Sequence, residues 1–97
     1  MIEGNQSMKR CVIEREIPAV GNMNETELGG AAKVSNDALA QLAPKIQWQH
    51  SYVTADKTFC IYLAEDEAAI HAHAKISGFP ASTISEVTGI IDPTTAR

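Results

Sequence analysis

The chain has 97 residues, of which 44% are hydrophobic, and its formal net charge is −4. This length suits one domain with one core, and the hydrophobic share argues against disorder. The negative charge and the scattered basic residues exclude nucleic acid and anionic membrane as expected partners. No apolar run approaches the ~20 residues needed to span a bilayer, and the first ten residues lack the apolar segment of a secretory signal. We therefore expect a flexible segment 1–7 and a single cytoplasmic domain over residues 8–97.

Six segments carry the pattern of a helix or a strand. In chain order they are a strand over 8–17, a helix over 24–43, strands over 46–53 and 58–64, a helix over 66–77 and a strand over 84–91. Apolar and β-branched residues favour the strands, and Pro18, Pro44 and Pro93 end three of the segments. Gly78 lies where a helix C-terminus is expected.

This order, β-α-β-β-α-β, is the ferredoxin-like pattern. It predicts an α+β fold in which two helices cover one face of a four-stranded antiparallel sheet. The other sheet face would be bare in a monomer and would expose a large apolar patch. We therefore expect a homodimer that packs sheet against sheet, as in dimeric α/β barrels, with room for a small site between the sheet and its helices.

The hairpin over residues 47–64 contains the only Trp and both Tyr residues. Simple alternation along a strand places Trp48, His50 and Tyr52 on one face. On the second strand, Cys60 and Tyr62 share a face. Polar and aromatic side chains on one strand face predict that the hairpin forms the floor of a polar site.

The length of the hairpin loop decides whether Cys60 faces His50. A two-residue loop, Ala55-Asp56, pairs His50 with Ile61 and keeps Cys60 on the opposite face. A loop one residue longer or shorter brings Cys60 to the side of His50. The sequence leaves both registers open.

Three histidines differ in their expected surroundings. His71 lies on the polar face of its helix, so we expect it at the surface. His73 lies on the inward face, as either a hydrogen-bonded core residue or a metal ligand. His50 lies mid-strand, where imidazole must be hydrogen-bonded, for example to Glu14 or a Tyr hydroxyl, or must bind a metal ion.

The remaining candidates have a structural and a functional interpretation each. Cys11 and Cys60 are expected to be free thiols in a reducing compartment, and Cys60 is either a small core residue or a thiolate ligand. Glu14 and Glu86 lie on strands, where they form ion pairs, with Arg10 or Arg15, or serve as metal ligands or a general base. No CxxC, GxGxxG, P-loop or HExxH motif is present, and catalysis has little direct support.

Four segments together resemble a known family. They are VIEREIP from Val12, WxxSYVTxDKxxCxY from Trp48, HAxxxGFPA from His73 and ISEVxxIIDPTTA from Ile84. They are similar to a family of small bacterial proteins, long catalogued as a domain of unknown function, that includes a nickel-responsive, nickel-binding member. The resemblance covers about residues 8–97 and implies a ferredoxin-like fold, usually dimeric, with a nickel-binding role.

Three hypotheses follow. The first is a cytoplasmic, dimeric metal-binding protein of metal homeostasis or stress response, with Ni²⁺ preferred over Zn²⁺ or Cu²⁺. Its predicted metal ligands are His50, His73, Glu14, Cys60, Glu86 and Tyr52. The second is a dimeric α/β-barrel enzyme or small-ligand-binding protein in which His50 and Tyr52 are an acid/base pair. The third is an interaction module in which the histidines are structural. The first hypothesis depends on His50 and His73 meeting over one sheet surface.

Overall fold

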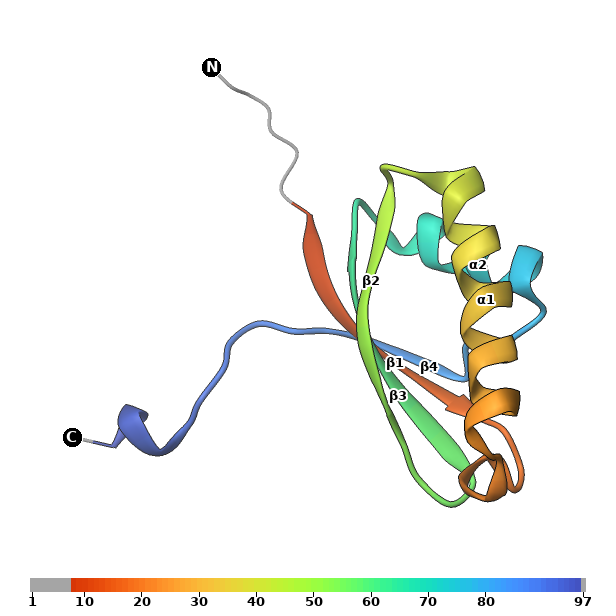
Figure 1. The fold of residues 1–97 in the computed structure, drawn as a ribbon. Helices are drawn as coiled ribbons and strands as arrows, with labels where there is room; N and C mark the ends of the chain where they lie inside the picture. Colours follow the sequence, from red (N-terminus) through yellow and green to blue (C-terminus); the bar gives the residue numbers. More distant parts are fainter. Residues whose placement is uncertain (1–7, 97) are drawn as a thin grey trace.

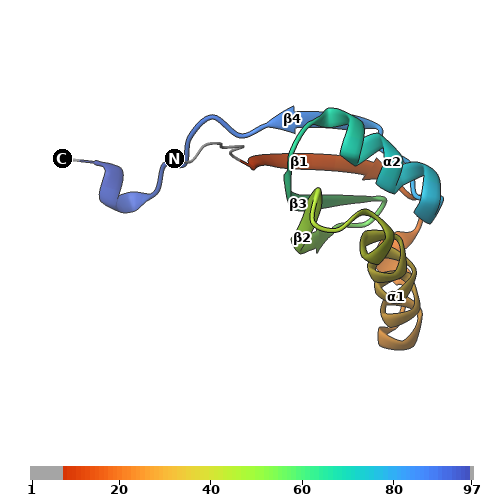
Figure 2. The same cartoon turned by 90° about the horizontal axis from the view of Figure 1, so that it is seen from above.

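The structure is a computed structural model, and it describes residues 8–96. A four-stranded sheet lies on one side, and two helices cover one of its faces (Figures 1 and 2). The elements are β1 (Lys9–Glu16), the short 3-10 helix η1 (Val20–Asn22), α1 (Glu25–Leu42), β2 (Ile46–Val53), β3 (Lys57–Ala64), α2 (Glu67–Ser77), β4 (Thr83–Glu86) and the 3-10 helix η2 (Pro93–Thr95). The strand order is β2-β3-β1-β4, with every neighbouring pair antiparallel. This confirms the predicted ferredoxin-like fold.

Local sequence explains where the two helices begin and end. Asn24 and Glu27 form a reciprocal capping box at the start of α1, and each side chain accepts a hydrogen bond from the other residue's backbone N–H. Asp66 caps α2 by accepting a hydrogen bond from the N–H of Ala69 at 2.9 Å. Gly78 ends α2 at φ 81°, a left-handed conformation that glycine adopts without steric cost.

Pairing across the sheet assigns each strand residue to one of two faces. On β1, Cys11, Ile13 and Arg15 point toward the helices, and all three are buried. Val12 and Glu14 alternate with them and point the other way. We call the helix-covered side the inner face and the opposite side the outer face. On β3, Cys60 and Tyr62 both lie on the inner face, which confirms the prediction that they share a face of this strand.

A β-bulge at Gln49 places the two halves of β2 on different faces from those that simple alternation predicts. Trp48 pairs with Tyr62, but the next paired residue, His50, lies opposite Ile61, so Gln49 is an extra residue without a partner on β3. The extra residue reverses the alternation. Trp48 therefore points inward, whereas His50 and Tyr52 point outward. The prediction that Trp48, His50 and Tyr52 share a face is wrong.

The hairpin turn itself follows one of the two predicted registers. The N–H of Thr54 donates to the carbonyl of Lys57 at 2.9 Å, which closes a two-residue loop of Ala55 and Asp56. His50 therefore pairs with Ile61, and Cys60 does not share its face.

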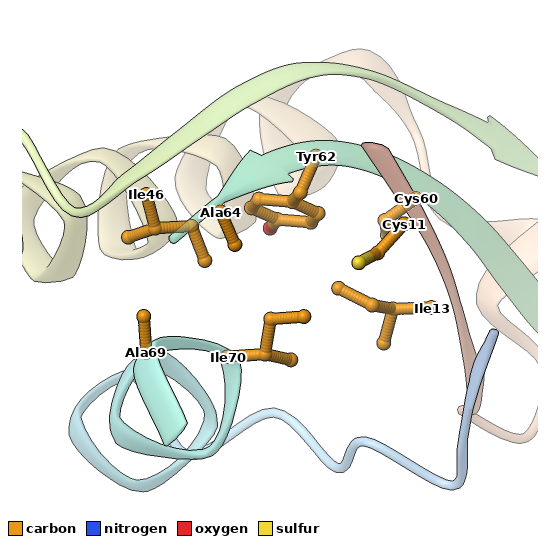
Figure 3. Packing of buried hydrophobic residues seen from close by; sticks show 8 residues of the cluster. All are labelled: Cys11, Ile13, Ile46, Cys60, Tyr62, Ala64, Ala69 and Ile70. Atoms are coloured by element: carbon orange, nitrogen blue, oxygen red, sulfur yellow. The ribbon is translucent and has the colours of Figure 1, made fainter. Parts of the chain in front are cut away.

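The hydrophobic core lies mainly between the sheet and α2 (Figure 3). The largest fully buried side chains are three core residues, Ile13, Tyr62 and Ile70, and the polar residue His73 beside them. Helix α1 lies beside β2, farther from the middle of the sheet (Figure 2). Of its residues only Ser35 and Ala38 are buried, so α1 leaves space between itself and β3.

The last strand is shorter than predicted. The prediction extended it to Ile91, but β4 ends at Glu86. Glu86 pairs with Cys11, and β1 begins only two residues earlier at Lys9, so β4 runs out of partner. Beyond Glu86 the chain extends away from the helices (Figures 1 and 2). Ile90 and Ile91 on this segment are 70% and 84% exposed.

The loop before α1 is tied to the tip of the β2–β3 hairpin. Ile17 and Gly21 donate backbone hydrogen bonds to the carbonyls of Asp56 and Ala55, at 3.0 and 2.9 Å. The N–H of Ala19 donates to the Asp56 carboxylate at 2.8 Å. A Cβ on Gly21 would lie 2.8 Å from the Cα of Ala55, so only glycine permits this approach.

Candidate functional site

Three of the six predicted metal ligands lie on the outer face. His50 and Tyr52 are exposed neighbours there, with His50 Nε2 3.1 Å from the Tyr52 hydroxyl and the rings edge to face. Glu14 lies on the same face but two strands away on β1. It accepts a 3.4 Å hydrogen bond from Lys57 Nζ, so its ionic partner is Lys57 and not the predicted Arg10 or Arg15.

His73 lies on the inner face and is fully buried. Its Nδ1 lies 3.5 Å from Arg15 Nη2, and its Nε2 lies 3.1 Å from Ser35 Oγ. His50 points to the opposite side of the sheet. The expectation that the two imidazoles meet over one sheet surface is therefore wrong within a single chain.

Cys60 and Glu86 lie on the inner face, on the opposite side of the sheet from His50. Cys60 is a buried free thiol whose Sγ lies 3.5 Å from Thr58 Oγ1. Glu86 lies at the exposed end of β4 opposite Cys11, beside a hollow of about 170 Å³ that Asp66 and Glu67 also line. Within residues 8–96, no group of three or more His, Cys, Asp or Glu side chains is close enough to hold a metal ion.

Four buried side chains form a connected polar cluster between the sheet and the helices. Arg15 comes from β1, Ser35 from α1, Tyr62 from β3 and His73 from α2. The Arg15 guanidinium also donates to the carbonyls of Phe79 and Pro80, at 3.3 and 2.7 Å, and its Cζ lies 5.8 Å from the centre of the Tyr62 ring. Both helices and the two central strands of the sheet, β3 and β1, therefore each place one residue at this point.

The cluster fixes the protonation of its members. Burial and the adjacent Arg15 charge lower the pKa of His73, against a smaller upward effect of a hydrogen bond at Ser35. Burial raises the pKa of Tyr62, although hydrogen bonding by Ser35 and the charge of Arg15 oppose the change. Near neutral pH, His73 is therefore neutral and Tyr62 keeps its proton.

A cavity of about 270 Å³ adjoins this cluster. The inner face of the hairpin forms one wall with Trp48, Cys60 and Tyr62, and α1 forms the opposite wall with Ala32 and Ser35. The loop that is tied to the hairpin tip closes one end with Ile17, Val20 and Met23. The expected space between the sheet and its helices is therefore present, and its walls are mainly apolar.

Sequence reasoning does not identify Arg15 as a site residue, because an arginine on a strand is expected only to pair with acids. The signal that identifies it is the period of two in β1: it follows Cys11 and Ile13 at the next inward position. Ser35 lies on the apolar stripe of α1, which is the corresponding signal on a helix.

A small ferredoxin-like domain with one open sheet face and one covered cavity is the class that this geometry defines. A family described as "Nickel responsive protein SCO4226-like" matches residues 12–87, and the chain belongs to this family. The crystal structure of SCO4226 from Streptomyces coelicolor A3(2) is similar in fold, with a TM-score of 0.71 and 10% sequence identity over 84% of this chain and 99% of that chain. Comparison with curated proteins finds no match. In residues 8–96, the helices are too short or too polar to cross a membrane.

Proposed function

We propose that the protein is a nickel-binding homodimer in which His50 is the principal metal ligand. The observation that carries this proposal is the exposed imidazole of His50, which lies beside Tyr52 on an open sheet face. Neutral imidazole is a common ligand of Ni²⁺, Cu²⁺ and Zn²⁺. The family description, nickel responsive, favours Ni²⁺ among these ions.

A second copy of the chain would supply what one copy lacks. Glu14 is two strands away from His50, or about 10 Å, which is too far for one ion to bind both. If two outer faces pack about 10 Å apart, as sheets do, side chains from both subunits point into the same layer. We therefore propose that each site combines His50 of one subunit with His50 or Glu14 of the other, and with water.

Two apolar surfaces support the dimer. The outer face carries half-buried Val12, Phe59, Ile61 and Leu63 together with exposed Tyr52. The segment after β4 presents Ile90 and Ile91 almost fully to solvent. Monomers rarely expose contiguous apolar patches of this kind, because burying them in an interface is favourable.

The biological role that fits these properties is nickel homeostasis or a response to nickel stress. We propose a cytoplasmic location, which is supported by two free thiols at Cys11 and Cys60.

The test is titration calorimetry of tag-free protein with Ni²⁺, Zn²⁺ and Cu²⁺. We expect His50→Ala to weaken Ni²⁺ binding at least tenfold, since it removes an imidazole ligand, about 1.4 kcal/mol or more of binding free energy. His71→Ala is the matched control, because His71 is also exposed but is paired with Glu67 on α2. Equal Ni²⁺ affinity of the wild-type and His50→Ala proteins would exclude the proposal.

The other predicted ligands are tested in the same assay. Cys60→Ser, Glu86→Gln and His73→Gln should leave Ni²⁺ affinity within about threefold of wild type, because the three residues lie away from the outer face at His50. A loss in these variants without a loss in His50→Ala would move the metal site to the inner face. Sedimentation of Ile61→Asp with and without Ni²⁺ tests the dimer, since a charge at the centre of the outer face should yield monomers that bind Ni²⁺ more weakly.

The cavity favours a second candidate function, which is the binding of a small organic molecule. The acid/base pair considered for an enzyme, His50 with Tyr52, lies on the outer face, whereas the cavity lies on the inner face. Any small-ligand function is therefore supported by the inner residues and not by that pair.

A further inference from the structure

We infer that the cavity between α1 and the sheet binds a small monocarboxylate with an apolar body, held through Arg15. This site is independent of the proposed nickel site, because the two lie on opposite faces of the sheet. The observation that carries the inference is the state of the Arg15 side chain. It is only 2% exposed and lines the cavity, yet none of the acidic side chains in residues 8–96 lies within 4.0 Å of its nitrogens.

A buried guanidinium without a counterion is costly, because its charge loses the hydration that it has in water. The carbonyls of Phe79 and Pro80 and the Nδ1 atom of His73 offset part of this cost. These contacts use three of the five N–H donors that an arginine carries, and none of them neutralises the charge. An anion in the cavity would supply the missing charge and accept the remaining donors.

The direction of the hydrogen bonds adds a second donor. Arginine can only donate, so His73 Nδ1 must accept from it and the proton of the neutral ring lies on Nε2. Nε2–H then donates to Ser35 Oγ, at 3.1 Å. Tyr62 keeps its proton near neutral pH and lines the cavity, so its O–H can donate to a ligand acceptor.

The two sides of the cavity define the ligand class. Arg15 and Tyr62 together offer donors only, which matches a carboxylate that accepts from both and pairs with a guanidinium in a planar fashion. The remaining wall is mainly apolar, with Leu28 and Ala32 from α1 and Trp48 from β2, and its polar side chains are the hydroxyls of Ser51 and Thr58. A phosphate would leave more oxygens facing apolar side chains than a carboxylate, so it fits less well. The volume, about 270 Å³, is just below the usual range of ligand pockets and suits a compact ligand.

Trp48 provides the measurement, because it is the only tryptophan and it lines the cavity. The probes are phenylacetate and hexanoate, with phenylacetamide and hexanamide as uncharged controls of nearly equal shape. We expect both acids to change Trp48 fluorescence in a saturable way and to raise the melting temperature. The amides should bind at least about tenfold more weakly, since a hydrogen bond between two charged groups is stronger than one to a neutral amide.

Two variants test the two halves of the site. Arg15→Met should abolish the preference for acids over amides. Since Arg15 also holds the carbonyls of Phe79 and Pro80, this variant is checked for folding by circular dichroism. Ala32→Leu fills the cavity while Arg15 is retained, and it should abolish binding of all four probes without loss of fold. His50→Ala is the matched control on the outer face and should bind the acids as wild type does.

The inference would be overturned by any of three results. These are equal affinities for acids and amides, full acid binding by Ala32→Leu, or no binding of either acid up to about 10 mM, which corresponds to less than about 3 kcal/mol. None of these results depends on Ni²⁺, so failure here leaves the proposed metal site untouched, and failure of the metal site leaves this inference untouched.

Discussion

The two faces of the sheet differ in how they treat polar side chains. On the inner face, Arg15 and His73 are buried and joined through specific hydrogen bonds. On the outer face, His50 and Glu14 remain in contact with solvent, each with one polar neighbour. Histidine is therefore a buried, hydrogen-bonded residue on the inner face and a solvent-exposed residue on the outer face. The comparison teaches that residue type alone does not identify a site, because burial decides what an imidazole can do.

The alternation of β2 is the first point at which the comparison can be broken. Deleting Gln47, which pairs with Leu63, would make Ile46 and Trp48 consecutive, so one of these two inward side chains must turn to the outer face. We expect a loss of about 3–5 kcal/mol in the free energy of unfolding, similar to removing a large core side chain. Urea denaturation measures it. Deleting the bulge residue Gln49 is the control, because it leaves Trp48 opposite Tyr62 and His50 opposite Ile61, and it should cost less than about 1.5 kcal/mol.

The second largest effect is the difference in unfolding free energy between matched Ile→Ala substitutions on the two faces. Ile13 is fully buried on the inner face, whereas Ile61 is half-buried on the outer face. We expect Ile13→Ala to cost about 2–5 kcal/mol. Ile61→Ala should cost less than about 1.5 kcal/mol in dilute protein, because less apolar area is lost from burial.

Urea denaturation at several protein concentrations separates folding from association in this pair. Ile61→Ala should weaken the concentration dependence of the midpoint, whereas Ile13→Ala should not. Equal costs for the two variants in dilute protein would show that the faces are equally buried in solution.

Polar substitutions should give a smaller contrast. Ser35→Ala removes the partner of His73 Nε2 and leaves a buried donor unpaired. We expect a cost of about 1–3 kcal/mol. Lys57→Met removes the partner of Glu14 at the outer face, where both side chains are partly exposed, and should cost less than about 1 kcal/mol. Thermal and urea unfolding measure both costs. A larger loss of unfolding free energy in Lys57→Met than in Ser35→Ala would show that the buried cluster is hydrated.

The smallest predicted effect is the pH dependence of the unfolding free energy, which is expected to come from His73 and Tyr62 on the inner face. The pKa of His73 is lowered in the folded state, mainly by burial. As pH falls below the ordinary value of 6.5, the unfolded chain takes up a proton that the folded chain does not, so stability decreases. The slope contributed by this one group cannot exceed about 1.4 kcal/mol per pH unit.

Urea titrations between pH 8 and pH 5 measure this slope, about three pH units that span the window. His73→Gln should remove the contribution of His73, whereas His71→Gln at the surface should leave it in place. At the alkaline end the sign reverses, because the raised pKa of Tyr62 means that the folded chain retains a proton above pH 10 that the unfolded chain loses. An unchanged slope in His73→Gln would show that His73 is accessible to protons in the folded state.

Periodicity and turn chemistry were enough to predict the element order, the shared face of Cys60 and Tyr62 on their strand and the inward position of His73. Five of the six predicted elements lie within one residue of their observed bounds. These features depend on local pattern, which a single sequence contains. The exposure of His71 also followed from its helical neighbours.

The features that could not be predicted depend on tertiary pairing. Nothing about Gln49 itself indicates a bulge, which exists only relative to β3. The early end of β4 depends on where β1 begins, although Val87 to Ile91 have strand-forming residues. The separation of His50 from His73 follows from the two-residue hairpin loop, which places His50 opposite Ile61, whereas the bulge turns Trp48 to the inner face. The unpaired state of Arg15 could not be predicted either, because it depends on Glu14 lying on the outer face and Arg15 on the inner face.

The attachment of Gly21 to the hairpin tip has a consequence for how this protein tolerates sequence change. Exposed two-residue turns usually accept insertions and substitutions freely. Here Ala55 and Asp56 serve as docking points for another loop, and Gly21 has no space for a side chain. In a deep mutational scan, this solvent-exposed turn should therefore tolerate as few substitutions as an interior position. Its surface accessibility alone would predict a much higher tolerance.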